Sequence, residues 1–147
     1  MGQRQVSADI GAPPERVFDL YTDAQRVVDW QTGVKSVEAT GSLAQVGSTW
    51  TVRYGGPFTV KGTVLEVQRP VSHRQRFSEM VGLVNCTTTA RFVPAGSGTR
   101  ATFDLDYRVV AGPIGRLFDG IVGGEIVGRF NKDLAGLKAL AEHLTGE

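Results

Sequence analysis

The sequence predicts an α+β fold with one antiparallel sheet of about seven strands and one long C-terminal helix, and with two short helices after the first strand. Three observations support this prediction. Closely spaced strand patterns occupy residues 34–109, and after Gly112-Pro113 the apolar residues change to a helical period. The length of 147 residues suits one domain, so we expect residues 1–147 to fold as a single unit.

The first element is a half-buried strand that leads into the two short helices. Val6, Ala8 and Ile10 alternate with polar residues, which is the period of a strand with one buried face. Pro13-Pro14 then favours a helix start, because the missing N–H of a proline has no partner in the first turn. We expect helices at residues 14–21 and 24–30.

The central part of the chain contains six further strand patterns separated by glycine and proline turn signals. The clearest covers residues 99–109, where apolar and polar residues alternate throughout. Neighbours this close along the chain are antiparallel, because a parallel pair needs a crossover of about a dozen residues. The expected strands are 34–40, 48–54, 58–68, 73–81, 84–93 and 99–109.

The C-terminal part is expected to form the long helix. Apolar residues recur at spacings of three and four from Val127 to Leu144, which gives one continuous apolar stripe. Glycines interrupt the preceding stretch, and each costs about 1 kcal/mol relative to alanine inside a helix. We therefore expect a kink or a break near Gly123-Gly124.

The composition argues against several classes of function. Lys and Arg total 16 against 15 acidic residues, without a basic run, so a nucleic-acid surface is not expected. The single cysteine, Cys86, excludes an intrachain disulfide and is expected to be a small buried residue rather than a reactive thiol. With two histidines and no acidic cluster, we expect neither a metal site nor a cofactor.

The sequence also bears on location and assembly. No stretch approaches about 18 consecutive apolar residues, so a transmembrane segment is not expected. The first residues lack the apolar core of a signal peptide, and a cytoplasmic location is expected. The oligomeric state is left open, a homodimer included.

Several local motifs occur in an order that is specific to one group of proteins. Residues 10–18 resemble a strand-to-helix transition, 46–50 a turn into the third strand, and 64–70 a fourth strand ended by proline. Residues 92–100 and 133–138 are similar to a last hairpin and a terminal helix. The chain thus resembles the START-like or SRPBCC superfamily, which includes polyketide cyclase-like, Bet v 1-like and lipid-transfer proteins. The resemblance implies a helix-grip fold, in which the curved antiparallel sheet wraps around the long C-terminal helix. Enzymes, carriers, receptors and chaperone cofactors all occur on this fold.

Such a fold implies a cavity between the sheet and the long helix. We expect residues on the apolar side of each strand, and the facing residues of the helix, to line it. The alternative for any single one of them is that it fills a core. The expected residues are Trp50, Val52, Tyr54, Phe58, Val60, Phe77, Glu79, Ala90, Phe92, Phe103, Leu105, Tyr107, Phe118, Val122, Ile126 and Phe130.

Three of these residues are weak candidates for chemistry. Tyr54 and Tyr107 carry hydroxyls that could bind a ligand oxygen or reach solvent at the sheet edge. Glu79 shares a face with Phe77, and desolvation in an apolar cavity would let its carboxyl act as a general acid or base. The alternative is a strand-end carboxylate in water. Glu125 raises the same question, and its spacing from Arg129 favours an exposed ion pair.

Three functions are compatible with these features. The first is binding or carriage of a small, largely apolar ligand that is lipid-like, polyketide-like or aromatic. The second is a polyketide cyclase or dehydratase activity in the same cavity. The third is a protein-interaction or chaperone-cofactor module, which an exposed apolar patch at Leu117, Phe118 and Ile121 would support. The glycines nearby could instead make that region a mobile gate.

Overall fold

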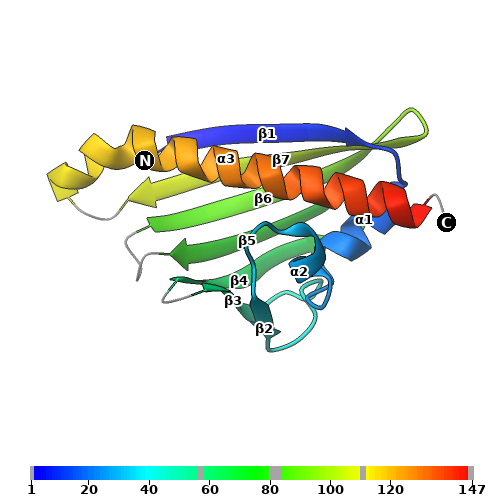
Figure 1. The fold of residues 1–147 in the computed structure, drawn as a ribbon, viewed down its shortest axis with the longest axis horizontal. Coiled ribbons are helices and arrows are strands. Elements are labelled where there is room, and N and C mark those ends of the chain that lie inside the picture. The colour runs from blue at the N-terminus through cyan, green and yellow to red at the C-terminus, as the bar shows by residue number, and fades with distance from the viewer. Residues whose placement is uncertain (1, 56–57, 80–83, 110–111, 146–147) are drawn as a thin grey trace.

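The computed structural model describes residues 2–55, 58–79, 84–109 and 112–145. In these residues an antiparallel sheet of seven strands curves around one C-terminal helix of 34 residues (Figure 1). Two short helices follow the first strand. The predicted fold class is therefore confirmed.

The sheet has the order β1-β7-β6-β5-β4-β3-β2, so the first strand closes against the last and every other pairing joins consecutive strands. The strands are β1 (Gly2–Ile10), β2 (Ser36–Ala39), β3 (Thr49–Gly55), β4 (Phe58–Gln68), β5 (Ser72–Glu79), β6 (Val84–Ala95) and β7 (Gly98–Val109). Each lies within a few residues of its predicted range. The predicted end of β5 at Val81 falls outside the described residues.

The helices are α1 (Pro14–Tyr21), α2 (Val27–Trp30) and α3 (Gly112–Thr145). Helix α2 begins later than predicted, because Asp23 directs a turn before it. The Asp23 carboxylate accepts a hydrogen bond from the amide of Gln25, and its carbonyl accepts one from the amide of Arg26. Among the described residues, no helix is long and apolar enough to cross a membrane.

A row of alternately large and small residues crosses the sheet and creates its concave face. In register from β1 to β3, its members are Gly2, Tyr107, Cys86, Phe77, Gly62 and Trp50. A side chain at Gly62 would collide with the Trp50 indole, and one at Gly2 with the Tyr107 ring. The small residues therefore leave the space that the neighbouring rings occupy.

Helix α3 is continuous, so of the two alternatives expected near Gly123-Gly124 the break is wrong, and the kink stays a prediction. Gly123 lies against the hydroxyl and ring of Tyr107, where a larger residue would collide. Gly136 packs in the same way on the backbone carbonyl of Trp30. The cost of about 1 kcal/mol per glycine is offset because the helix can approach the rest of the fold closely at these points.

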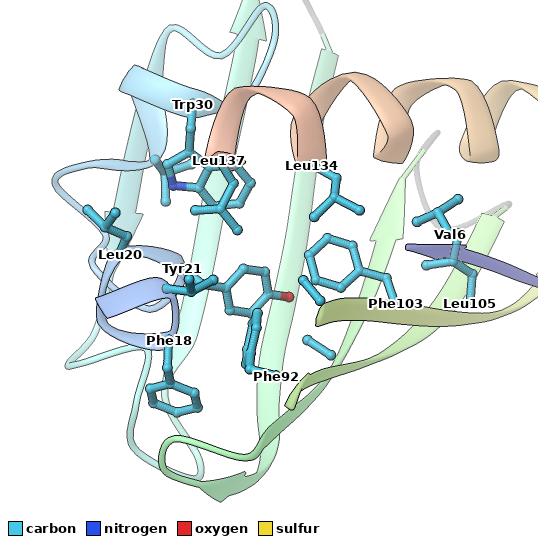
Figure 2. Packing of buried hydrophobic residues seen from close by; sticks show 14 of the residues in the cluster. Val6, Phe18, Leu20, Tyr21, Trp30, Phe92, Phe103, Leu105, Leu134 and Leu137 are labelled. Carbon is cyan, nitrogen blue, oxygen red and sulfur yellow. The ribbon is translucent and has the colours of Figure 1, made fainter. Parts of the chain in front are cut away.

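The main core lies where α1, α2 and the C-terminal half of α3 cover the sheet (Figure 1). Figure 2 shows Tyr21 among the rings of Phe92 and Phe103, with ring centroids 5.5 and 5.4 Å away. Phe18 meets Phe92 edge to face at 5.9 Å. These contacts fill one end of the concave face and leave the other end to a cavity.

Candidate ligand-binding cavity

A cavity lies between the concave face of β3, β4 and β5, helix α2 and the middle of α3. Its volume is about 60 Å³, which is room for about two water molecules. A larger ligand must therefore extend into the mouth of the cavity or move its walls apart. The lining residues are Tyr21, Val27, Trp30, Gln31, Val37, Leu43, Trp50, Val52, Tyr54, Val60, His73, Gln75, Phe77, Phe103, Arg129, Phe130 and Asp133.

The walls of the cavity are aromatic. Phe77 and Phe130 stack with ring centroids 6.1 Å apart, and Trp50 lies 6.2 Å from Phe77. Phe103 meets Phe130 edge to face at 5.9 Å. Aromatic pairs prefer such offset and edge-on arrangements, in which a flat guest can join the same packing. The aromatic surface of the cavity suits a ring system.

A chain of hydrogen bonds with fixed direction crosses this apolar surface. The indole N–H of Trp50 can only donate, so the group that it meets at 3.1 Å is the carbonyl oxygen of Gln75. The amide of Gln75 then donates to the Tyr21 hydroxyl oxygen at 3.2 Å. Burial raises the pKa of Tyr21, so its hydroxyl keeps its proton and can donate it further.

Two residues of the lining, Trp30 and His73, each have a buried ring nitrogen without a hydrogen-bond partner among the described residues, namely Trp30 Nε1 and His73 Nδ1. Trp30 is 4% exposed and His73 1%. The other ring nitrogen of His73 lies 2.7 Å from the carbonyl oxygen of Leu43. Burial lowers the pKa of His73, which favours its neutral form.

At the side of the cavity, α3 and the end of β5 are joined by an ion pair. Both terminal nitrogens of Arg129 donate to the Glu79 carboxylate, at 3.2 and 2.6 Å. Burial lowers the pKa of Arg129, but the hydrogen bonds and charge of Glu79 outweigh it and raise the pKa. The pairing of Arg129 with Glu125 expected from helical spacing is thus wrong, and Glu125 is exposed. The cross-element pair forms because Arg129 is on the buried side of α3.

Asp133 is the charged residue that sequence reasoning missed. Its carboxylate accepts a hydrogen bond from the amide of Thr32 at 3.0 Å, which ties α3 to the chain after α2. The residue is only 5% exposed, and burial raises its pKa to about 6 although Thr32 and Arg129 favour the charged form. An acidic residue inside the apolar stripe, between Phe130 and Leu137, was the available signal. A carboxyl that titrates near neutral pH can exchange protons with a bound molecule.

Tyr54 is the one chemical candidate from the sequence that lies in the cavity lining. Burial raises the pKa of its hydroxyl to about 12, although the charge of Arg129 favours ionisation. Glu79 lies beside the cavity, and its carboxylate oxygens accept two hydrogen bonds from Arg129, so they are engaged in the ion pair rather than turned to a ligand. Tyr107 is buried between Gly2 and Gly123, outside the lining.

The expected cavity residues fall into two groups. Those in the lining are Trp50, Val52, Tyr54, Val60, Phe77, Phe103 and Phe130. The second group lies outside the lining, and it includes Glu79 and Tyr107. Four more of its members are buried in the core between the sheet and the helices, namely Ala90, Phe92, Leu105 and Ile126. Val122 is half-buried against that core.

Phe58 and Phe118 do not face a cavity, and the expectation for both is wrong. Phe58 is 67% exposed because the first residue of β4 lies beyond the edge of the core. Phe118 is 48% exposed on α3, together with Leu117 and Ile121. The apolar patch that the interaction hypothesis requires is therefore present, but none of its three residues lines the cavity.

The described residues contain no group of three or more His, Cys, Asp or Glu side chains that could hold a metal ion. Cys86 is buried, and burial raises the pKa of its thiol to about 11. The expected role of Cys86 as a small buried residue is confirmed. The chemistry available in the cavity is thus that of Asp133, His73 and tyrosine hydroxyls.

Comparisons with known proteins agree with this architecture. A family model described as "Polyketide cyclase / dehydrase and lipid transport" matches residues 1–142. Among proteins with curated descriptions, none matches the sequence. Protein TTHA0849 from Thermus thermophilus is 25% identical, with a TM-score of 0.67 over 94% of this chain and 95% of that one.

Two more distant structures share the fold. Ara h 8.0201 is 9% identical, with a TM-score of 0.78 over 95% of this chain and 97% of that one. The di-domain ARO/CYC StfQ from the steffimycin biosynthetic pathway is 11% identical, with a TM-score of 0.80 over 99% of this chain and 52% of that one. The TM-scores indicate a shared helix-grip fold, and identities this low carry no conclusion beyond the fold.

Proposed function

Because the chain belongs to the polyketide cyclase/dehydrase and lipid transport family, within the START-like (SRPBCC) superfamily, we propose that it binds a small, largely apolar ligand with a flat ring system. The observation that carries this proposal is the narrow cavity bounded by Trp50, Phe77 and Phe130. A flat ring can stack on these walls or meet them edge-on, and an acyl chain makes no such contacts.

The proposal is tested by filling the cavity. Val60 lines it and is buried, so Val60→Phe should weaken binding of the uncharged fluorescent probe N-phenyl-1-naphthylamine by about tenfold or more. Val93→Phe on β6 is the matched control, because Val93 is exposed and outside the cavity. Probe binding that is equal in both variants, with both folded by circular dichroism, would contradict the proposed site.

A second candidate function is a cyclase or dehydratase activity on the bound ring. It is favoured by Asp133, whose pKa of about 6 suits proton transfer near neutral pH. An aryl ketone such as acetophenone offers a simple probe, because its α-protons exchange with deuterated water slowly without a base. We expect the protein to accelerate this exchange, and Asp133→Asn to abolish the acceleration while it leaves the affinity for the ketone nearly unchanged. Equal acceleration by both proteins would exclude Asp133 as the base.

A further inference from the structure

A second hollow, the outer recess, lies on the convex face of the sheet, which is turned away from α3. It crosses β3, β4 and β5 and has a volume of about 390 Å³. Its floor is the part of the sheet at Gly62, which lies in register between Trp50 and Phe77. Successive side chains of a strand point to opposite faces, so the residues before and after these three form its two walls. The walls are polar, and one holds Thr51, Lys61 and Ser78 while the other holds Thr63 and Arg76.

These walls offer hydrogen-bond donors that are not used within the protein. Thr51, Thr63 and Ser78 are half-buried, and their hydroxyls have no hydrogen-bond partner among the described residues. Lys61 and Arg76 are exposed, and neither forms an ion pair with any described residue. An ammonium and a guanidinium can only donate, so the outer recess suits a molecule that accepts hydrogen bonds on several sides.

The neighbouring arginines of the convex face are neutralised within the sheet, in contrast to these two cations. Arg74, two residues before Arg76 on β5, bonds to Glu66 of β4 at 3.1 Å. Arg53 of β3 pairs with Glu38 of β2 at 3.7 Å. The carboxylates that border the outer recess on β2 and β4 are therefore engaged elsewhere, and the recess keeps two positive charges.

The register places the two cations close enough to share one anion. Lys61 is opposite Ser78, and Arg76 comes two residues before Ser78 on the same face. Such diagonal neighbours lie about 7–8 Å apart, so both long side chains can reach one point above Gly62. The carboxylate of Asp106 is in the row of Arg76 but two strands away, which is about 10 Å. Two like charges repel each other at this spacing, and an anion between them replaces the repulsion with attraction.

A phosphate monoester matches the outer recess in charge and in shape. Its second pKa is about 6, so near pH 8 it carries close to two negative charges, which equal the charge of Lys61 and Arg76. Its oxygens accept hydrogen bonds in several directions, and proteins bind phosphate with both the guanidinium fork and the lysine ammonium. None of the exposed large apolar side chains among the described residues lines the recess, which favours a water-soluble molecule over a lipid surface.

We propose that the outer recess binds the phosphate group of a small, water-soluble phosphate monoester, held between Lys61 and Arg76 above Gly62. This site is separate from the apolar cavity, although Trp50 and Phe77 belong to the walls of both, on opposite sides of the sheet. The inference goes beyond the proposed function and does not depend on the ligand of the cavity.

Glycerol 3-phosphate is the probe, because it has no ring that could stack in the apolar cavity. Glycerol is its matched control, since it lacks only the phosphate. In an NMR titration near pH 8 at about 0.1 M ionic strength, glycerol 3-phosphate should shift the amide signals of Lys61, Gly62 and Ser78 until they saturate, and glycerol should not shift them. Shifts that do not saturate, or that are equal for the two probes, would overturn the inference.

Three variants that each remove one positive charge from the convex face test the assignment to residues. Lys61→Gln and Arg76→Gln should each raise the Kd for glycerol 3-phosphate by about tenfold. Arg91→Gln on β6 is the control, because Arg91 is outside the recess and about 13 Å from Arg76 in the register, where its charge is screened. The Asp104 partner of Arg91 keeps its hydrogen bond from Gln5. Equal weakening by all three variants would refute the site, because a general attraction to basic residues would then explain the binding.

Vesicles distinguish the soluble ligand from a lipid that carries the same chemical group. Phosphatidic acid presents a phosphate monoester at the surface of phosphatidylcholine vesicles. We expect the wild-type protein to remain in the supernatant when such vesicles are sedimented. Sedimentation with the vesicles that Arg76→Gln abolishes, together with a failure to bind glycerol 3-phosphate, would overturn the assignment to a soluble molecule.

Discussion

Replacing Asp133 by asparagine should stabilise the protein at neutral pH. The ordinary pKa of an aspartate is 3.8, and burial raises that of Asp133 to about 6. Between about pH 4 and about pH 6 the folded protein therefore keeps a proton that the unfolded chain has lost. The contribution of this carboxyl to the free energy of unfolding falls as the pH rises through that range. The difference in pKa corresponds to about 3 kcal/mol, which is the cost of the buried charge above about pH 7.

Asparagine removes this charge but keeps an oxygen that can accept the hydrogen bond from Thr32. The free energy of unfolding of Asp133→Asn should thus exceed that of the wild-type protein by up to about 3 kcal/mol near pH 8, and the difference should shrink to nearly zero near pH 4. Urea unfolding followed by the fluorescence of Trp30 and Trp50 measures both values.

The control is Glu125→Gln on the same helix, at an exposed carboxylate. Its effect should stay within about 0.5 kcal/mol at both pH values. All other carboxylates titrate in the wild-type protein and in the variants, so they cancel in the comparison. An Asp133→Asn variant that is destabilised near pH 8, or whose difference from the wild-type protein is the same at both pH values, would refute the assignment of a buried, desolvated charge.

Three further predictions follow from the packing. Gly123→Ala should destabilise the protein by about 1–3 kcal/mol in thermal unfolding, because the new methyl group collides with the Tyr107 ring. Gly124 has open space around it, so Gly124→Ala should stabilise the protein by up to about 1 kcal/mol. Equal effects of the two substitutions would contradict the close approach of Gly123 to Tyr107. Arg129→Gln and Glu79→Gln should each lower the free energy of unfolding by about 1–2 kcal/mol, and the double variant should lose less than the sum of the two. Additive losses would mean that the partly buried ion pair is not coupled. Cys86 should not react with Ellman's reagent in the native protein near pH 8, because it is buried and burial raises the pKa of its thiol to about 11. Rapid labelling of the folded protein would contradict this prediction by showing that the thiol is accessible.

The arrangement of the strands was predictable because alternation is a local property. In residues 99–109 every second side chain is apolar, and all of those in β7 from Ala101 to Tyr107 are buried. The continuity of α3 was not predictable in the same way. The propensity of Gly123 opposes a helix, but its missing side chain allows contact with Tyr107, and a sequence pattern contains no information about that distant partner.

The cavity could be predicted only in part, for a related reason. Alternation identified the inward face of each strand, and Trp50 and Phe77 are among the residues that line the cavity. It did not reveal how far along each strand the core extends. Phe92 has the same parity but is covered by Phe18 of α1, and Phe58 lies past the other end of the packed region. Which inward residue meets a cavity depends on what covers it, and that is a tertiary property.

Asp133 links stability to function in a way that separates the two proposed activities. Its hydrogen bond to Thr32 would be made equally well by asparagine, so the tie between α3 and the chain after α2 does not by itself require a charge. A carboxyl that costs about 3 kcal/mol at neutral pH is the kind of local conflict that proteins retain at functional sites. A carrier needs the shape and the polar partners of the cavity, which Asp133→Asn preserves. If the variant is more stable and binds N-phenyl-1-naphthylamine as well as the wild-type protein does, carriage alone gives no reason for the carboxylate, and proton transfer to a bound ligand becomes the function that accounts for it.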